Sequence, residues 1–187
     1  MDNVDLKKLY DDYKKKFHNN SCMIETNYKK LNEFIVKFNI LDLHHLFGIH
    51  KLENINASKT KEFLEKNELD LNKYRKYKNF NEVVNRINNY NFISEIFIDK
   101  KYNYCILAKD LNKNTMKLSV VFYKENEDKY IVFGLRKIYK NVFVPTTLHE
   151  GRGQAIYKSY RQTKIKNIKW LDWDYSWSFY YEKMGDK

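Results

Sequence analysis

The spacing of hydrophobic residues predicts helices in the first half of the chain. Apolar side chains recur every three or four positions through residues 2–17, with lysine pairs on the opposite side, as in an amphipathic helix. Similar patterns predict helices at 58–66 and 81–89, each opened by a Ser or Asn that can cap its first turn. A shorter helix is expected between Asp42, which can cap its start, and Gly48, which can end it.

From Asn91 onward the pattern changes to alternation with period two, which predicts strands. Short polar turns separate four such runs, and these predict an antiparallel meander: "YNYCILAKD", "MKLSVVFYKE", "KYIVFGLRKI" and "VFVPTTL". The basic piece "KIKNIKWL" could add an edge strand, and residues 22–38 predict a hairpin. The expected fold is therefore α+β, with N-terminal helices packed on a four- to five-stranded antiparallel sheet.

The 187 residues are enough for one domain with a sizeable core. We expect a helical extension over 1–21, one domain over 22–170 and an acidic aromatic tail over 171–187. The rings of this tail are expected to pack over the sheet, and the alternative is a surface for docking a partner or stacking bases.

The cysteines and the apolar runs indicate a cellular compartment. Cys22 and Cys105 are far apart and each lies in an apolar, strand-like context, which predicts buried thiols in a reducing compartment. No run approaches the 18 or so apolar residues that a membrane span needs, and the N-terminus does not resemble a signal peptide. We expect a cytoplasmic protein with no membrane contact.

The positive charge is concentrated in one segment. Residues 1–128 carry 23 basic and 19 acidic side chains, whereas residues 129–169 carry ten basic and one acidic. The second segment holds three of the five arginines, and arginine binds phosphate in a fixed two-pronged geometry. This distribution favours a phosphate-bearing partner more than the lysine count alone does.

Three of the five histidines lie within residues 44–50, in the phrase "HHLFGIHK". They lack the i, i+4 spacing, the "HExxH" pattern and the nearby cysteine pair that zinc sites use, so we expect no metal. Adjacent helical positions point about 100° apart, so either His44 or His45 should pack inward. The other, together with His50 and Lys51 beyond Gly48, can face a groove.

The strand "VFGLRKI" is predicted to place one cation on a covered face. Alternation directs Arg136 and Lys137 to opposite faces of a regular strand, so only one of them can point outward. A buried arginine needs an anion, which is either a Glu or a phosphate.

The phrase "PTTLHEGRGQ" is expected to form one polar loop after the only proline. It gathers Thr146, Thr147, His149, Glu150, Arg152 and Gln154. Its two glycines permit unusual backbone angles and the close approach of a ligand. An acid, a base and an arginine are what metal-free cleavage of a phosphodiester needs, whereas the plain alternative is a solvated turn.

The order of these motifs resembles a phage-encoded nuclease family grouped with barnase, EndoU, the colicin E5 and D nucleases and RelE-like toxins, in its fourth phage-associated subgroup. A "HLxGxxK" type helix end and a late Arg-Lys strand leading to a "VPxS" type strand carry the resemblance over about residues 22–170. The matching residues are His45, Leu46, Gly48, Lys51, Leu135, Arg136, Lys137, Val144 and Pro145. Thr146 and Thr147 stand where the family tends to have a Ser, and "LHEGRGQ" does not align with the pattern.

The resemblance implies a metal-independent ribonuclease from a phage or mobile element, with no cofactor, acting on RNA through the 2′-hydroxyl. An antitoxin or immunity protein is a further partner of such proteins. The expected catalytic residues are His45, Arg136, His149 and Glu150, and those expected to bind substrate are His50, Lys51, Lys137, Thr146, Thr147, Arg152 and Gln154. The alternative is a non-catalytic RNA- or DNA-binding module, or an anti-defence protein, with the same fold.

Overall fold

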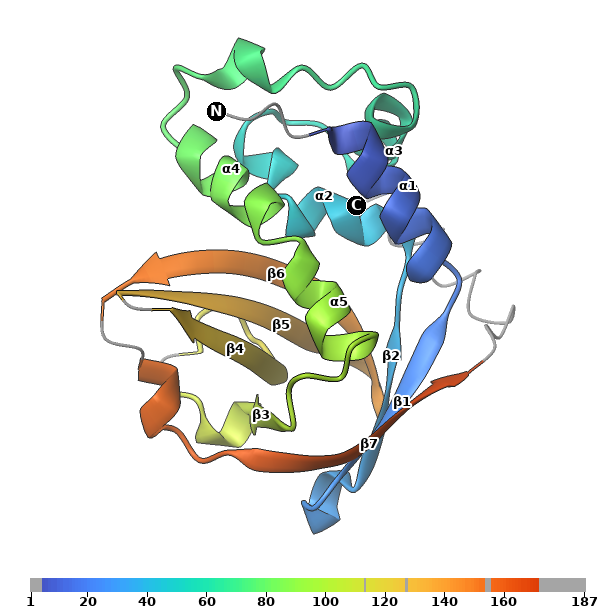
Figure 1. The fold of residues 1–187 in the computed structure, drawn as a ribbon, viewed down its shortest axis with the longest axis vertical. Helices are drawn as coiled ribbons and strands as arrows, with labels where there is room; N and C mark the ends of the chain where they lie inside the picture. The colour runs from blue at the N-terminus through green and yellow to red at the C-terminus, as the bar shows by residue number, and fades with distance from the viewer. Residues whose placement is uncertain (1–4, 113, 127, 154–155, 172–187) are drawn as a thin grey trace.

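The computed structural model describes residues 5–112, 114–126, 128–153 and 156–171, and shows a barrel with helices gathered at one end (Figure 1). The α-helices are α1 (Leu6–Lys16), α2 (Leu43–Leu46), α3 (Ala57–Glu65), α4 (Phe80–Asn88) and α5 (Asn91–Phe97). The strands are β1 (Ser21–Thr26), β2 (Glu33–Lys37), β3 (Tyr104–Leu107), β4 (Val120–Asn126), β5 (Lys129–Tyr139), β6 (Val142–Arg152) and β7 (Thr163–Leu171). Short 3-10 helices are η1 (Lys29–Leu31), η2 (Ile40–Asp42), η3 (Ile49–Lys51), η4 (Leu71–Tyr74), η5 (Ala108–Asp110) and η6 (Ile156–Ser159).

The seven strands close into a barrel in the order β1-β2-β6-β5-β4-β3-β7. The expected sheet of four or five antiparallel strands is therefore wrong. The predicted strands and the β1-β2 hairpin exist, but β2 pairs in parallel with β6, through Ile35 with Val142 and Val36 with Phe143. The basic piece that forms β7 is not an edge strand, because it pairs with β1 on one side and β3 on the other.

A helix packs against the inner face of this barrel, at a place where the sequence pattern predicts extended chain. Residues 91–97 form α5, which lies between β5 and β2 (Figure 1). Its Phe97 ring is 5.0 Å from Phe38, 5.7 Å from Phe122 and 5.6 Å from Phe133, measured between centroids. The apolar side of α5 therefore packs, through Phe97, against inward-facing aromatic residues of β4 and β5 and against Phe38.

The first helix belongs to the same core. Asp5 caps α1 by accepting a hydrogen bond from the Lys8 N–H, and Tyr10, Tyr13 and Phe17 are fully buried. The Tyr13 hydroxyl donates to the Asp42 carboxylate over 3.2 Å. Asp42 does not cap α2 as predicted, because its carboxylate also accepts from the Asn39 N–H (2.8 Å) in a capping box on η2.

Both cysteines, Cys22 and Cys105, are buried free thiols, as predicted. Burial raises the pKa of Cys105 to about 12, so this thiol is unreactive at neutral pH. Among the described residues, no helix is long and apolar enough to cross a membrane. The expectation for the aromatic tail falls almost wholly on residues 172–187, which lie outside the described residues.

The strands β4, β5 and β6 separate two packed layers. Their inner face, which includes Phe122, Phe133 and Leu148, packs in the main core with α5. Their outer face carries a second, smaller cluster with Val121 and Val132. From residue 144 onward β6 pairs only with β5 among the described strands, and α2 and α4 lie beside it there (Figure 1).

Candidate functional site

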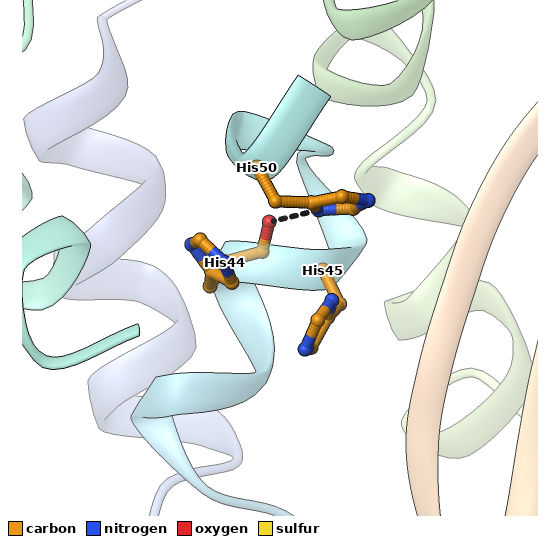
Figure 2. Close-up of side chains that lie close together, drawn as sticks. All are labelled: His44, His45 and His50. Carbon is orange, nitrogen blue, oxygen red and sulfur yellow. Dashed lines mark hydrogen bonds between the residues drawn. The ribbon is translucent and has the colours of Figure 1, made fainter. Parts of the chain in front are cut away.

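The histidine phrase folds back on itself at a glycine. Gly48 follows α2 with φ +76°, a left-handed angle that favours glycine, and η3 then returns toward the helix. The His50 Nδ1 therefore lies 3.5 Å from the carbonyl oxygen of His44 (Figure 2). The exposed rings of His45 and His50 end 5.0 Å apart, measured between centroids.

His44 is the inward-facing member of the adjacent pair, as predicted for one of the two. Its ring is buried, and its Nδ1 lies 2.8 Å from the Thr60 hydroxyl on α3. Burial, with smaller contributions from His45 and His50, lowers the pKa of His44 to about 4. This imidazole is neutral at pH 7 and connects α2 to α3.

Nitrogen atoms of His44, His45 and His50 lie within 4.8 Å of one another, close enough to be considered for a metal ion. The turn at Gly48 brings the third ring in without any i, i+4 spacing. Zinc ligands lie about 2.0–2.1 Å from the ion, so the rings would have to close further around it. His44 and His50 already use one ring nitrogen each in a hydrogen bond. We assign no metal here, and chelation is the test of that choice.

A buried arginine connects the histidine segment to the barrel. Arg86, on α4, donates from Nη1 to the His45 carbonyl oxygen (3.0 Å) and to the Thr147 hydroxyl (3.3 Å). Its Nε and Nη2 both donate to Glu82 Oε1, at 3.2 and 2.9 Å, and the same oxygen accepts from Lys51 Nζ at 2.6 Å. The guanidinium thus has the hydrogen-bonding partners that a buried charge requires.

Gly48 is needed for this arginine as well as for the turn. A Cβ at Gly48 would lie 2.8 Å from Arg86 Cδ and 3.1 Å from Nε. Arg86 and Glu82 were not predicted from the sequence. Their i, i+4 spacing is that of an ordinary surface ion pair, and only the glycine in "HHLFGIHK" hints that something packs closely against it.

His149 lies on the outer face of β6, near this arginine. Its cross-strand partner Val132 belongs to the outer cluster. The pKa of His149 is lowered to about 4, mainly by burial. The charges of Arg86 and Lys51 lower it further, whereas the charge of Glu82 raises it. Its Nδ1 is buried and has no hydrogen-bond partner among the described residues.

Arg136 and Lys137 are both exposed, so the prediction that one of them points to a covered face is wrong. The register of β5 shifts on both sides of this pair, between Gly134 and Leu135 and again between Lys137 and Tyr139. These irregularities, together with the position of the pair near the end of β5, leave both cations in solvent. Burial is the main cause that lowers the pKa of His45, and the charges of His50, Arg136 and Arg86 lower it further. The contribution of Arg136 indicates that its guanidinium lies near the His45 ring.

The phrase expected to form a polar loop is strand β6 as far as Arg152, so the loop prediction is wrong. Thr146 is the extra residue of a bulge opposite Gly134 and Leu135, and its hydroxyl donates to a carbonyl of its own strand. Thr147 is buried beneath Arg86. Arg152 is exposed at the end of β6, and Gln154 lies outside the described residues.

His149 and Glu150 are separated by the strand geometry. Successive side chains of a strand point to opposite faces, and Ile131, the partner of Glu150, packs against the main core. The Glu150 carboxylate accepts from the Asn89 amide (3.1 Å) and pairs with Lys129 Nζ (3.1 Å). The structure therefore brings His45, His50, Lys51, Thr147 and His149 together around Arg86, and places Glu150 on the other face.

A family model described as phage-Barnase-EndoU-ColicinE5/D-RelE like nuclease4 matches residues 5–181. No curated protein and no solved structure matches the chain.

Proposed function

Because the chain belongs to the fourth family of phage-Barnase-EndoU-ColicinE5/D-RelE like nucleases, its substrate class is nucleic acid, and we propose that it cleaves RNA without a metal ion. The observation that carries the proposal is the pair of exposed imidazoles, His45 and His50, with the exposed guanidinium of Arg136 near His45. The description of the family supports a phage or mobile-element setting, which is part of the proposal.

In this proposal His45 is the general base. Burial and the charges of His50, Arg136 and Arg86 lower its pKa, so the ring is neutral at pH 7 and can accept a proton. It takes the proton of the 2′-hydroxyl, and the resulting oxygen attacks the adjacent phosphorus. The bond from phosphorus to the 5′-oxygen then breaks, which leaves a 2′,3′-cyclic phosphate and a free 5′-hydroxyl.

Arg136 would stabilise the charge that develops on the phosphorane. A guanidinium accelerates the chemical step when its electrostatic interaction with the phosphate is stronger in the transition state than in the ground state. Lys137, at the same end of β5, and Arg152, at the end of β6, are exposed cations suited to the flanking phosphates.

His50 is the candidate for protonating the leaving 5′-oxygen. When its Nδ1 donates to the His44 carbonyl, the Nε2 of the charged ring is left to deliver the second proton. Burial lowers the pKa of His50, the His44 carbonyl raises it, Arg86 and Lys51 lower it, and Glu82 raises it. The negative charge of a bound phosphodiester would favour the protonated form further.

Arg86 acts as a positioning residue in this scheme. It donates to the backbone of His45 and to Thr147, so it fixes the base relative to β6. Lys51 and Glu82 complete the same network and hold Arg86 in place. An antitoxin or immunity protein would present acidic groups to the exposed cations Arg136, Lys137 and Arg152.

The test is cleavage of a defined RNA with EDTA present. Cleavage should persist and yield a cyclic phosphate end, and it should stop when the 2′-hydroxyl at the cut is replaced by hydrogen. His45→Ala and His50→Ala should each lose most activity. The control is His18→Asn, since His18 follows α1, has no contact with the Arg86 network among the described residues, and accepts from the Ile40 N–H.

Three outcomes would contradict this mechanism. RNA that is bound but remains intact would support the non-catalytic module. Loss of cleavage in EDTA, with recovery on adding Zn²⁺, would make the three histidines a metal site. A His45→Ala protein that cuts at the parental rate would move the search for the base to His149.

The pH profile gives a second test. The pKa values of His45 and His50 are both lowered from their ordinary value of 6.5. The profile of kcat/KM reports the acid and base of the free enzyme, and its maximum lies midway between their two pKa values. The optimum should therefore fall below pH 6.5, and a maximum above pH 7.5 would exclude this pair.

A further inference from the structure

A pocket of about 390 Å³ opens on the outer face of the barrel wall, the face that also carries His149. Three half-buried tyrosines line it together with apolar side chains of β4 and of the segment before it: Tyr130, Tyr157, Tyr160, Leu118 and Val121. None of these residues has a part in the proposed cleavage.

The wall of the pocket reaches toward His149. Tyr130 pairs across the strands with Gly151, and a Cβ at Gly151 would lie only 2.2 Å from Tyr130 Cζ. The tyrosine ring therefore lies over the bare backbone of β6. Gly151 and His149 are two residues apart on the same face, which is about 7 Å along a strand.

The tyrosines are held in a fixed arrangement. The Tyr157 ring is stacked on Tyr123 at 5.9 Å and 26°, and lies 5.4 Å from Tyr130 and 5.9 Å from Tyr160, between centroids. The Gln162 amide donates to the carbonyl oxygens of Tyr157 and Tyr160, each at 3.2 Å.

The opposite rim of the pocket is also ordered by side-chain hydrogen bonds. The Asn114 amide donates to the Leu118 carbonyl (2.6 Å), and its oxygen accepts from the Leu118 N–H (2.8 Å). Asn112 and Thr115, which line the same rim, are exposed and can offer polar groups to a ligand. The exposed cations Lys158 and Arg161 lie beside the tyrosines in sequence.

We propose that this pocket holds one nucleobase of the RNA, that of a nucleotide next to the cut. Single-stranded RNA is bound through splayed bases that stack on aromatic side chains while cations follow the backbone. The pocket offers aromatic faces, a polar rim and neighbouring cations. Its Tyr130 wall covers Gly151, about 7 Å along β6 from His149, and His149 lies with His45 and His50 around Arg86. This inference rests on the proposed nuclease function for the placement of the cut.

The test uses a non-cleavable 2′-O-methyl oligonucleotide, so binding is read without catalysis. Removing one base at a time should lower affinity about 10-fold at one position next to the cut, the size expected for a lost stacking contact. In Tyr157→Leu the penalty at that position should disappear, whereas Tyr157→Phe, which keeps the ring, should retain it. The control Tyr77→Leu removes a 52% exposed ring from the helical end and should behave as the parent.

A photo-crosslink supplies a direct readout. 5-Iodouridine at the sensitive position should crosslink to Tyr157, Tyr160 or Tyr130 in the parent. The pocket proposal is overturned if no position is sensitive, or if the penalty is the same in Tyr157→Leu. If the protein cleaves RNA but no base position is sensitive, the pocket proposal is wrong and the nuclease proposal stands. If one position is sensitive but RNA is never cleaved, the nuclease proposal is wrong and the pocket still binds a base.

Discussion

The inner and outer faces of β5 and β6 are built from alternating residues of the same two strands. On the inner face Phe133, Leu135 and Leu148 are fully buried against the main core. On the outer face, or at its rim, stand Arg136 and His149. Neighbouring residues of one strand therefore have different roles, since one side chain packs in the core and the next lies in the candidate site. The rigid inner packing is what holds the outer groups in register.

The largest expected effect separates two neighbours on opposite faces. Arg136→Ala should lower kcat/KM by about 100-fold or more, because it removes a charged phosphorane contact worth about 3 kcal/mol. Its melting temperature should stay unchanged, since the side chain is exposed. Leu135→Ala should instead lower the free energy of unfolding by about 2–5 kcal/mol and keep its activity per folded molecule. Thermal unfolding and steady-state kinetics measure both, and an unfolded Arg136→Ala protein would show a structural role.

A pair of glycines tests how the histidine segment is attached to the barrel. Gly48→Ala should cost about 2 kcal/mol or more, because it strains a left-handed residue and displaces Arg86. Gly153→Ala would also strain the backbone, because Gly153 has φ +102°, but its Cβ would have no heavy atom within 4 Å. Urea unfolding and cleavage rates should show a larger loss for Gly48→Ala in both measurements. Equal losses would mean that the contact with Arg86 contributes nothing.

Acid should destabilise the protein through His44. Its pKa is about 4 in the folded state against 6.5 ordinarily, so the unfolded chain binds the proton first as pH falls. The stability linked to His44 is complete above pH 6.5 and is lost as pH falls toward 4. Between pH 7.5 and 5 the parent should lose about 2 kcal/mol more than His44→Gln, as measured by urea unfolding. Asp42, whose pKa burial raises to about 8, titrates in both proteins and cancels in the comparison.

The smallest effect concerns the exposed cations of the outer rim. Affinity for a non-cleavable single-stranded RNA should fall with salt, with a log–log slope of about −0.7 per neutralised phosphate. Arg152→Ala should make this slope shallower by about 0.7 and leave the stability unchanged. An unchanged slope would show that Arg152 lies outside the path of the RNA.

Much of the local structure could be predicted from the sequence, because period and turn residues report local geometry. The helices at 58–66 and 81–89 and the strands of β3 to β6 follow from these signals, within a few residues. The parallel pairing of β2 with β6 and the closure through β7 could not be predicted, since strand partners are set by distant contacts. The helix at 91–97 was missed because its seven residues were grouped with the strand pattern that follows them, although Phe92, Ile93, Ile96 and Phe97 recur at helical spacing.

The candidate site shows the same division. His45, Arg136 and His149 were found because their residue types and motifs carry chemistry. Arg86 was missed because its role depends on the meeting of α2, α4 and β6, which no local pattern records. The separation of His149 from Glu150 follows from strand geometry once the segment is known to be extended rather than looped.

The closure of the barrel has a consequence for the order of folding. β1 pairs with β2 on one edge, but its other edge, where Ser21 pairs with Leu171, stays unpaired until β7 is synthesised. Contacts between such distant segments form slowly, because the chain loses entropy before it gains contacts. The residues of the candidate site, from His45 to His149, are all synthesised before β7, so they leave the ribosome before the barrel can close. A nascent chain that ends before β7 should therefore not yet have a complete nuclease site.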